Sequence, residues 1–426
     1  MRKLILLSVL SLTTFSFVPA NAQQANVCTT PGNAGKLYCI PILAVENLSA
    51  QPGNLTVEAG VPPAFSALNA AIGEQITQLP TPSPSSGIIF SFGPSGLVRE
   101  QNLGPIFSER PSTVGRHKLY VAFTYQFFQF DQLDRVNLKQ IPLQINGCGS
   151  GTIPGVTPGC GDAIETRSRL DLKLHQFTSY AAFGLTSRVD VSVAIPILDV
   201  RMAMQAGCVV CSQAVGGLSL IFNPNGKVSS ASGIGDVTFR VKALVWNGER
   251  AKLGVGTDIR TPTGDDLNLL GSGTVGVRPF AAFSYRASSR ISPHANIGYE
   301  WNGNSILAAT ANVAKHLPNS LTYNAGVDLS VVRPFELVFD FLGQTFIDAE
   351  RVILGQRAPL NHPDTACSLT SSGICQLQTL NTNSFSVGAK YNPAGNFLIT
   401  ASVLFKLDHN GLHYKPAPMI GISYTF

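Results

Sequence analysis

Charged side chains alternate with apolar ones in several segments, and this alternation is the main chemistry that the sequence offers. In residues 251–261, Lys252, Asp258 and Arg260 share one parity, and the other parity holds Leu253, Val255, Thr257 and Ile259. Successive side chains of a β-strand point to opposite faces. Acids and bases on one face can form cross-strand ion pairs, or they can line a polar path for a solute. For each of these residues taken singly, we favour a structural role in ion pairs over a role in lining a path for a solute.

The same pattern predicts a charged inner face along other segments. A charge in hydrocarbon is costly, so in membrane-crossing strands this face must point away from lipid. The candidate lumen-lining residues are Arg167, Arg169, Asp171, Lys173, Asp236, Arg240, Lys242, Lys252, Asp258, Arg260, Arg278, His294, Glu300, Asp328 and Asp340. We expect the same orientation for His175, Glu336, Lys390 and Lys406.

Residues 187–204 break the alternation. Asp190 falls on one parity, whereas Asp199 and Arg201 fall on the other. Proline cannot donate to a strand ladder and is common at bulges. We therefore expect a bulge near Pro196 that turns the charged side chains of this segment to one face.

The sequence has no recognisable pattern for enzymatic chemistry. It contains no Gly-x-Ser-x-Gly elbow, no His-Glu-x-x-His and no phosphate-binding loop. Asp265 and Asp266 follow a strand and are typical of a turn, and a calcium site there would need further ordered oxygen ligands. We predict that the protein is not an enzyme and binds neither a cofactor nor a metal.

Eight cysteines favour an oxidising compartment, where disulfides persist. They fall into four pairs of close neighbours in the sequence. The expected local pairs are Cys28 with Cys39, Cys148 with Cys160, Cys208 with Cys211, and Cys367 with Cys375. Spacing alone does not prove connectivity. The Cys-x-x-Cys at 208–211 has half of a zinc pattern, but no second such pair completes it.

The first residues have the pattern of a secretory signal peptide. Arg2 and Lys3 form a short basic start, residues 4–18 are largely apolar, and Ala20-Asn21-Ala22 matches a cleavage site. We predict cleavage after residue 22. Only 13% of the residues are charged and the formal net charge is +5, so no nucleic-acid partner is indicated.

Twelve segments read as strands, and the connections between them alternate between short and long. The expected strands are 116–130, 164–184, 187–204, 233–247, 250–262, 273–287, 290–302, 320–333, 335–348, 382–392, 395–408 and 416–426. Transmembrane barrels have brief turns on one side and longer loops on the other. The last strand alternates Ile420, Ile422 and Tyr424 with small polar residues and ends at Phe426. We predict an all-β, up-and-down antiparallel barrel in a bacterial outer membrane, in which the chain enters the first strand and leaves the last strand on the periplasmic side.

The chain divides into three predicted parts: a signal peptide (1–22), an N-terminal segment (23–113) and the barrel (114–426). The N-terminal segment is rich in proline, serine, asparagine and glycine. We expect a helix over 64–78 and a hairpin over 87–101. A segment of this length ahead of a barrel is either a periplasmic extension or a plug inside the lumen, and both readings stay open.

One region resembles a known family. The residues are Gly233-Ile234-Gly235-Asp236-Val237, the run from Asp258 to Asp266, and Leu269-Leu270-Gly271-Ser272-Gly273. They are similar to the outer-membrane proteins assigned to a meta-pathway of phenol degradation. In outline the chain is also similar to outer-membrane fatty-acid transporters, which have a hatch ahead of a barrel. The resemblance implies the barrel fold and a transporter of hydrophobic or aromatic compounds.

Two functions follow as hypotheses. The first is a channel or transporter for small hydrophobic or aromatic solutes. The second is a structural or surface-interaction barrel without transport, held closed by lumen salt bridges and the N-terminal segment. The expected partners are outer-membrane lipid, a small hydrophobic solute and the outer-membrane assembly machinery. The final strand resembles the terminal strands of outer-membrane barrels, and this resemblance implies that the assembly machinery recognises Phe426.

Overall fold

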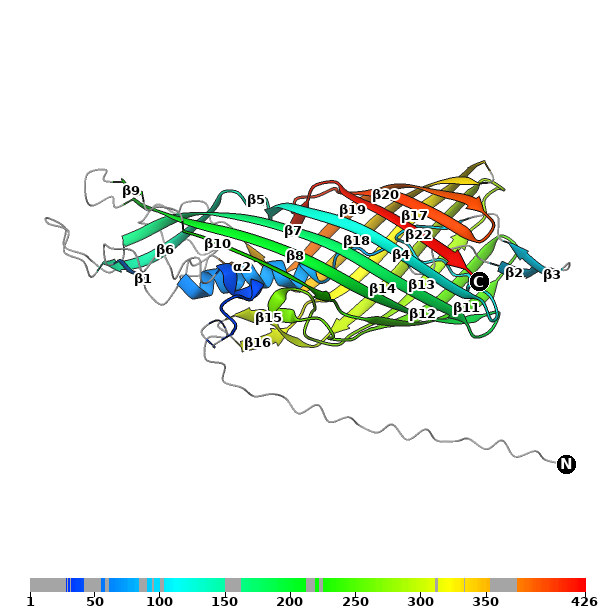
Figure 1. Ribbon diagram of the computed structural model, residues 1–426, viewed down its shortest axis with the longest axis horizontal. Coiled ribbons are helices and arrows are strands. Elements are labelled where there is room, and N and C mark those ends of the chain that lie inside the picture. The colour runs from blue at the N-terminus through cyan, green and yellow to red at the C-terminus, as the bar shows by residue number, and fades with distance from the viewer. Residues whose placement is uncertain are drawn as a thin grey trace, which may run out of the picture.

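The computed structural model of the chain is a closed antiparallel barrel of twelve strands (Figure 1). It describes residues 28, 30, 32–41, 55–57, 61–83, 90–93, 96–99, 103–149, 162–211, 219–221, 225–310, 313–332, 334–352 and 374–426. The predicted signal peptide lies outside these residues. Among the described residues, no helix is long and apolar enough to cross a membrane.

Each of the twelve predicted strands is present, and the predicted fold class is confirmed. The barrel strands are β4 (Leu119–Leu133), β7 (Asp162–Gly184), β8 (Val189–Cys211), β10 (Asn225–Ile234) continued by β11 (Thr238–Asn247), β12 (Ala251–Arg260), β13 (Gly276–Tyr285), β14 (Ile291–Asn302), β17 (Asn319–Val332), β18 (Phe335–Val352), β19 (Ile374–Ala394), β20 (Phe397–Lys406) and β22 (Ala417–Thr425). The last strand closes the barrel by pairing with the first, with Tyr424 opposite Val121.

Short turns gather at one end of the barrel, which we call the turn end, and longer connections gather at the other, the loop end. The chain needs only residues 185–188 to pass from β7 to β8, and residues 395–396 to pass from β19 to β20. The C-terminus lies at the turn end (Figure 1). β7 and β8 are both 23 residues long, so they continue well past the roughly 10 residues that cross a bilayer.

An apolar belt covers the outer wall of the barrel. Large side chains such as Phe239, Val255, Ile297 and Trp301 are 41–54% exposed. Their sequence neighbours of opposite parity point into the barrel, and Asp258 is only 3% exposed. This is the arrangement expected of strands that face lipid on one side and a polar lumen on the other.

The predicted bulge is not in β8. The register of β7 with β8 runs without a shift past Thr178 and Pro196. The extra residue lies in the partner strand instead, because Ile234 pairs with Ile197 whereas Thr238 pairs with Ala194. The break between β10 and β11 therefore sits opposite Pro196, where Gly235 N–H donates to the proline carbonyl at 2.8 Å.

Short elements complete the fold. They are η2 (Leu37–Cys39), β1 (Leu55–Val57), α2 (Val61–Ile76), β2 (Phe90–Gly93), β3 (Gly96–Arg99), β5 (Val136–Asn137), β6 (Ile141–Gly149), β9 (Ser219–Ile221), η3 (Asp266–Asn268), β15 (Asn304–Thr310), β16 (Val313–His316) and β21 (Leu412–Tyr414). The helix and hairpin predicted in the N-terminal segment are present as α2 and as the paired strands β2 and β3.

Helix α2 lies at the loop end, where it packs against β15, β18 and β21 (Figure 1). Leu68, Ile72 and Ile76 are at most 5% exposed and share one apolar core with inward side chains of β7 and β8. Burying each large aliphatic side chain contributes about 1.5–3 kcal/mol. A hydrophobic core thus fills the bore of the barrel at the loop end.

Candidate functional site: the barrel lumen and its two closures

A ladder of ion pairs runs across the wall formed by β11, β12 and β13. Arg240 donates to Asp258 with Nη2 to Oδ2 at 2.8 Å, and Arg278 donates to the same oxygen with Nε at 3.0 Å. Arg240 also pairs with Glu109 of the N-terminal segment. A buried charge is tolerated only when it is paired and hydrogen-bonded. The ladder therefore joins the wall to the chain inside the bore.

A second cluster lies nearer the loop end, in the residues of the recognised motif. Asp236 accepts hydrogen bonds from the backbone N–H of Gly264 at 3.1 Å and of Ser272 at 2.7 Å. Arg260 pairs with Asp236 at 3.2 Å and with Glu300 at 3.0 Å. The aspartate thus holds the loop between β12 and β13 against the break between β10 and β11.

Residues 103–114 cross the bore near the turn end, and charged wall residues hold their main chain. Glu336 accepts from the N–H of Leu103 at 3.0 Å, and Lys390 donates to the carbonyl of Pro105 at 2.7 Å. Asp340 accepts from the N–H of Phe107 at 3.2 Å. This part of the segment is fixed to β18 and β19.

The same segment is fixed on the opposite side of the barrel. Lys242 of β11 donates to the carbonyls of Arg110 and Ser112, both at 3.0 Å. Asp190 of β8 accepts from the N–H of Val114 at 3.2 Å. An extended chain inside a barrel has no strand partner for its backbone, so charged side chains take the place of a ladder.

His294 joins two wall carboxylates next to this segment. Its Nε2 lies 2.7 Å from Oδ1 of Asp340, and its Nδ1 lies 3.5 Å from Oδ2 of Asp328. Ser108 donates to the same Asp340 oxygen at 3.0 Å. The group therefore ties the wall to residues 103–114, which we call the lower closure.

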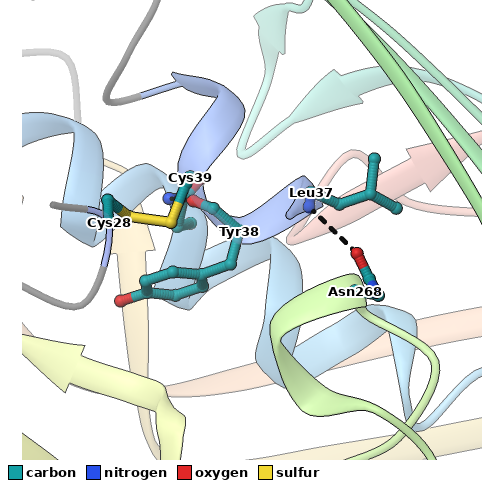
Figure 2. Close-up of a disulfide and its surroundings, with 6 residues drawn as sticks. Cys28, Leu37, Tyr38, Cys39 and Asn268 are labelled. Carbon is teal, nitrogen blue, oxygen red and sulfur yellow. Dashed lines mark hydrogen bonds between the residues drawn. A yellow bond between two sulfur atoms is a disulfide. The ribbon is translucent and has the colours of Figure 1, made fainter. Parts of the chain in front are cut away.

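A disulfide-bonded loop meets the loop end of the bore (Figure 2). The bond between Cys28 and Cys39 is present, as predicted. Leu37 and Tyr38 are buried, and the N–H of Leu37 donates to Asn268 of η3. Asn69 of α2 donates to the carbonyl of Tyr38. Residues 32–41 and α2 together form what we call the upper closure.

A salt bridge ties the upper closure to the recognised motif. Lys36 lies 2.5 Å from Asp265, which also accepts from Asn268. Burial alone would raise the pKa of Asp265, but the hydrogen bond and the charge of Lys36 hold that pKa below its usual value. Asp265 is therefore engaged with protein groups in the turn that the sequence predicted.

A cavity of about 280 Å³ lies in the bore between the closures. The polar part of its lining includes Arg240, Asp258 and Arg278, and the apolar part includes Phe280 and Leu342. Residues 75–83 and Phe107 and Glu109 of the N-terminal segment complete the lining. Ligand pockets commonly combine an apolar surface with a few placed polar groups.

The structure brings most of the predicted lumen residues together inside the barrel. Those with inward side chains are Asp236, Arg240, Lys242, Lys252, Asp258, Arg260, Arg278, His294, Glu300, Asp328 and Asp340. Glu109 is the residue that sequence reasoning missed. It stands in a segment without strand alternation, so nothing in the pattern marked it.

For part of β7 the predicted orientation is wrong. Arg169, Asp171 and Lys173 lie on the outer face with His175, whereas Leu170, Leu172 and Leu174 point inward and are at most 1% exposed. This stretch contacts the hydrophobic core around α2 on the inside, so the usual barrel polarity is reversed. The side chain of Arg167 lies outside the described residues, as do those of Cys148, Cys160, Cys208, Cys211, Cys367 and Cys375.

Residues 171–332 match the model of the family described as "Putative MetA-pathway of phenol degradation". This is the family that the sequence motif indicates. The matched range runs from β7 to β17 and includes Asp236 with the loop that it holds. No curated protein sequence matches the chain.

Several solved structures are similar to this chain. An outer membrane channel from Pseudomonas putida F1 is 14% identical, with a TM-score of 0.46 and coverage of 74% of this chain and 97% of that one. The toluene transporter TbuX of Ralstonia pickettii is 11% identical, with a TM-score of 0.35 and coverage of 75% and 92%. A FadL homologue of Pseudomonas aeruginosa is 10% identical, with a TM-score of 0.29 and coverage of 72% and 89%.

Proposed function

We propose that this chain is an outer-membrane transport barrel that passes a small hydrophobic or aromatic solute through a gated lumen. The observation that carries the proposal is the cavity between the two closures, which has an apolar surface and a wall of paired charges. An apolar solute can lie against Phe280 and Leu342, and its polar group can face the Arg240–Asp258–Arg278 ladder. The barrel catalyses no reaction in this account.

Passage requires the N-terminal segment to move, because that segment borders the cavity on both sides. The lower closure is held mainly through its main chain, by Lys242, Glu336, Asp340 and Lys390. We infer that opening exchanges these contacts for water without unfolding the barrel. The loop end faces the cell exterior in this proposal, and the turn end faces the periplasm.

The alternative is a barrel without transport. It is favoured by the number of buried charges that hold the lower closure, because each of them loses its partner when the segment leaves. A staple between the lower closure and the wall separates the two functions. A Cβ placed on Gly254 would lie 3.3 Å from the Cβ of Pro111 but also 2.9 Å from its Cα, so the segment must move away from β12 by a few tenths of an ångström to reach the separation of about 3.5–4.5 Å found in disulfides.

We predict that the double variant Pro111→Cys, Gly254→Cys loses uptake when its staple is oxidised. Initial uptake of a labelled monoaromatic alcohol would be measured in cells that produce the protein, before and after mild oxidation. Pro111→Cys alone and the unchanged protein under the same oxidant are the controls. Equal uptake with and without the staple would contradict gating by this segment, and the absence of uptake in every form would favour the alternative.

A further inference from the structure

The outer face of four neighbouring strands changes from apolar to polar along straight cross-strand rows. Phe177 of β7 pairs with Ile197 of β8, which pairs in turn with Ile234 of β10. These three side chains are 48–54% exposed. One row further toward the loop end, His175, Asp199 and Ser232 take their places. The apolar belt therefore ends at one level across β7, β8 and β10, and it ends one row later on β4, where Phe127 pairs with His175.

The next row toward the loop end contains only side chains that can donate hydrogen bonds. Gln129 of β4 pairs with Lys173 of β7, Lys173 with Arg201 of β8, and Arg201 with Ser230 of β10. We call these four residues the donor row. Figure 1 shows β7, β8 and β10 side by side where they leave the rest of the barrel toward the loop end.

Two cations stand directly opposite each other in the donor row, an arrangement that is unfavourable between neighbouring strands. Each has a carboxylate on its own strand: Lys173 lies 3.4 Å from Asp171, and Arg201 lies 2.9 Å from Asp199. The side chains of Lys173 and Arg201 are still 38% and 63% exposed. Arg169 lies further along the same face of β7, and Asp131 of β4, which lies 2.6 Å from His413, follows Gln129 on the outer wall.

The position of the donor row relative to the belt matches the headgroup level of a membrane. Aromatic side chains mark the boundary directly below it: Tyr125 packs on Phe177, and its hydroxyl lies 2.9 Å from Nδ1 of His175. Aromatic girdles of barrels stand at this interface. From Val189 to Ile197 the outward residues of β8 are apolar over roughly 26 Å of strand. With a strand tilt of about 40°, this stretch covers roughly 20 Å along the membrane normal, so the donor row lies just beyond an apolar belt somewhat shorter than the usual height of about 25 Å.

We propose that the donor row binds the phosphate groups of lipid in the outer leaflet. Ammonium and guanidinium groups are the side chains that favour phosphate, and arginine offers a planar fork of donors. The neighbouring amide and hydroxyl can donate to the remaining phosphate oxygens. The reversed polarity of this wall thus has a use: the inner face packs on α2, and the outer face holds lipid headgroups around the extended strands.

The test compares lipids that differ only in phosphate. The purified full chain is titrated in detergent with bisphosphorylated lipid A and with the same lipid after removal of its phosphates, and bound lipid is read by native mass spectrometry. We expect the phosphorylated lipid to bind the unchanged protein more tightly. A basic residue near an anionic surface contributes about fivefold in affinity, so Lys173→Gln with Arg201→Gln should weaken binding by roughly 25-fold.

Two control variants make the outcome specific. Arg290→Gln removes an exposed cation at the turn end and should leave lipid binding unchanged, and Lys173→Arg with Arg201→Lys should retain it. Heat-modifiable migration on gels establishes that each barrel is folded. Equal affinity for the two lipids, or equal affinity of the double glutamine variant and the unchanged protein, would overturn the proposal. Either result leaves the transport proposal untouched, because uptake is not measured.

Discussion

At the scale of single residues, the lumen is organised by carboxylates that serve two or more donors. Asp258 joins Arg240 to Arg278, and Asp236 joins Arg260 to the loop between β12 and β13. A buried ion pair contributes little net stability by itself, but removal of one partner leaves the other charge buried and unpaired. These aspartates are therefore the positions where a small change should have a large effect.

We predict that Asp258→Asn lowers the stability of the folded barrel by about 3–5 kcal/mol, because it leaves Arg240 and Arg278 close together without their shared carboxylate. The temperature at which the folded band disappears in heat-modifiable gel migration would report the loss. Glu249→Gln, an exposed change in a turn between strands, is the matched control and should migrate as the unchanged protein does. A variant Asp258→Asn as stable as this control would show that the ladder is dispensable.

Among the elements, the N-terminal segment contributes several short pieces, and each of them contacts a different part of the barrel wall. Helix α2 fills the loop end through apolar packing, whereas residues 103–114 hold the turn end through charges on their main chain. The disulfide-bonded loop joins α2 to η3 (Figure 2). The missing side chain of Gly73 allows α2 to pack closely on β15, because a Cβ at Gly73 would lie only 3.2 Å from the Cβ of Leu307.

Removing the disulfide should loosen the upper closure and leave the barrel intact. A disulfide commonly stabilises the structure it closes by about 2–4 kcal/mol. In the variant Cys28→Ala, Cys39→Ala we expect faster cleavage within residues 28–41 by an added protease, read by mass spectrometry. Heat-modifiable migration should not change. Unaltered cleavage would mean that the packing of Leu37 and Tyr38 holds the loop without the bond.

At the scale of the whole molecule, the fold combines two interiors in one barrel. The half near the turn end encloses polar groups, ion pairs and the cavity, and its outer wall is apolar. The part of β7 and β8 near the loop end encloses a hydrophobic core, and its outer wall is charged. The change from one arrangement to the other occurs where the lipid-facing belt ends.

This arrangement predicts which end of the molecule is outside the cell. An epitope inserted between β15 and β16 at the loop end should be labelled by antibody on intact cells. An epitope inserted after Ser289, in a short turn, should be labelled only after the outer membrane is permeabilised. Labelling in the opposite order would reverse the proposed orientation and with it the leaflet assigned to the donor row.

Local sequence pattern was sufficient to predict the twelve strands and the turn and loop ends, whereas the pairing of β22 with β4 that closes the barrel is a contact between distant segments. Alternation with period two is a local property, and it survives whatever the barrel encloses. The orientation of Arg169, Asp171 and Lys173 was decided only by the tertiary structure, because the polarity of each strand face depends on what it contacts. Where α2 fills the bore, leucines point inward and charges point to the outer wall. The position of residues 103–114 was decided in the same way, since side chains from distant strands hold their backbone and no local pattern records those partners.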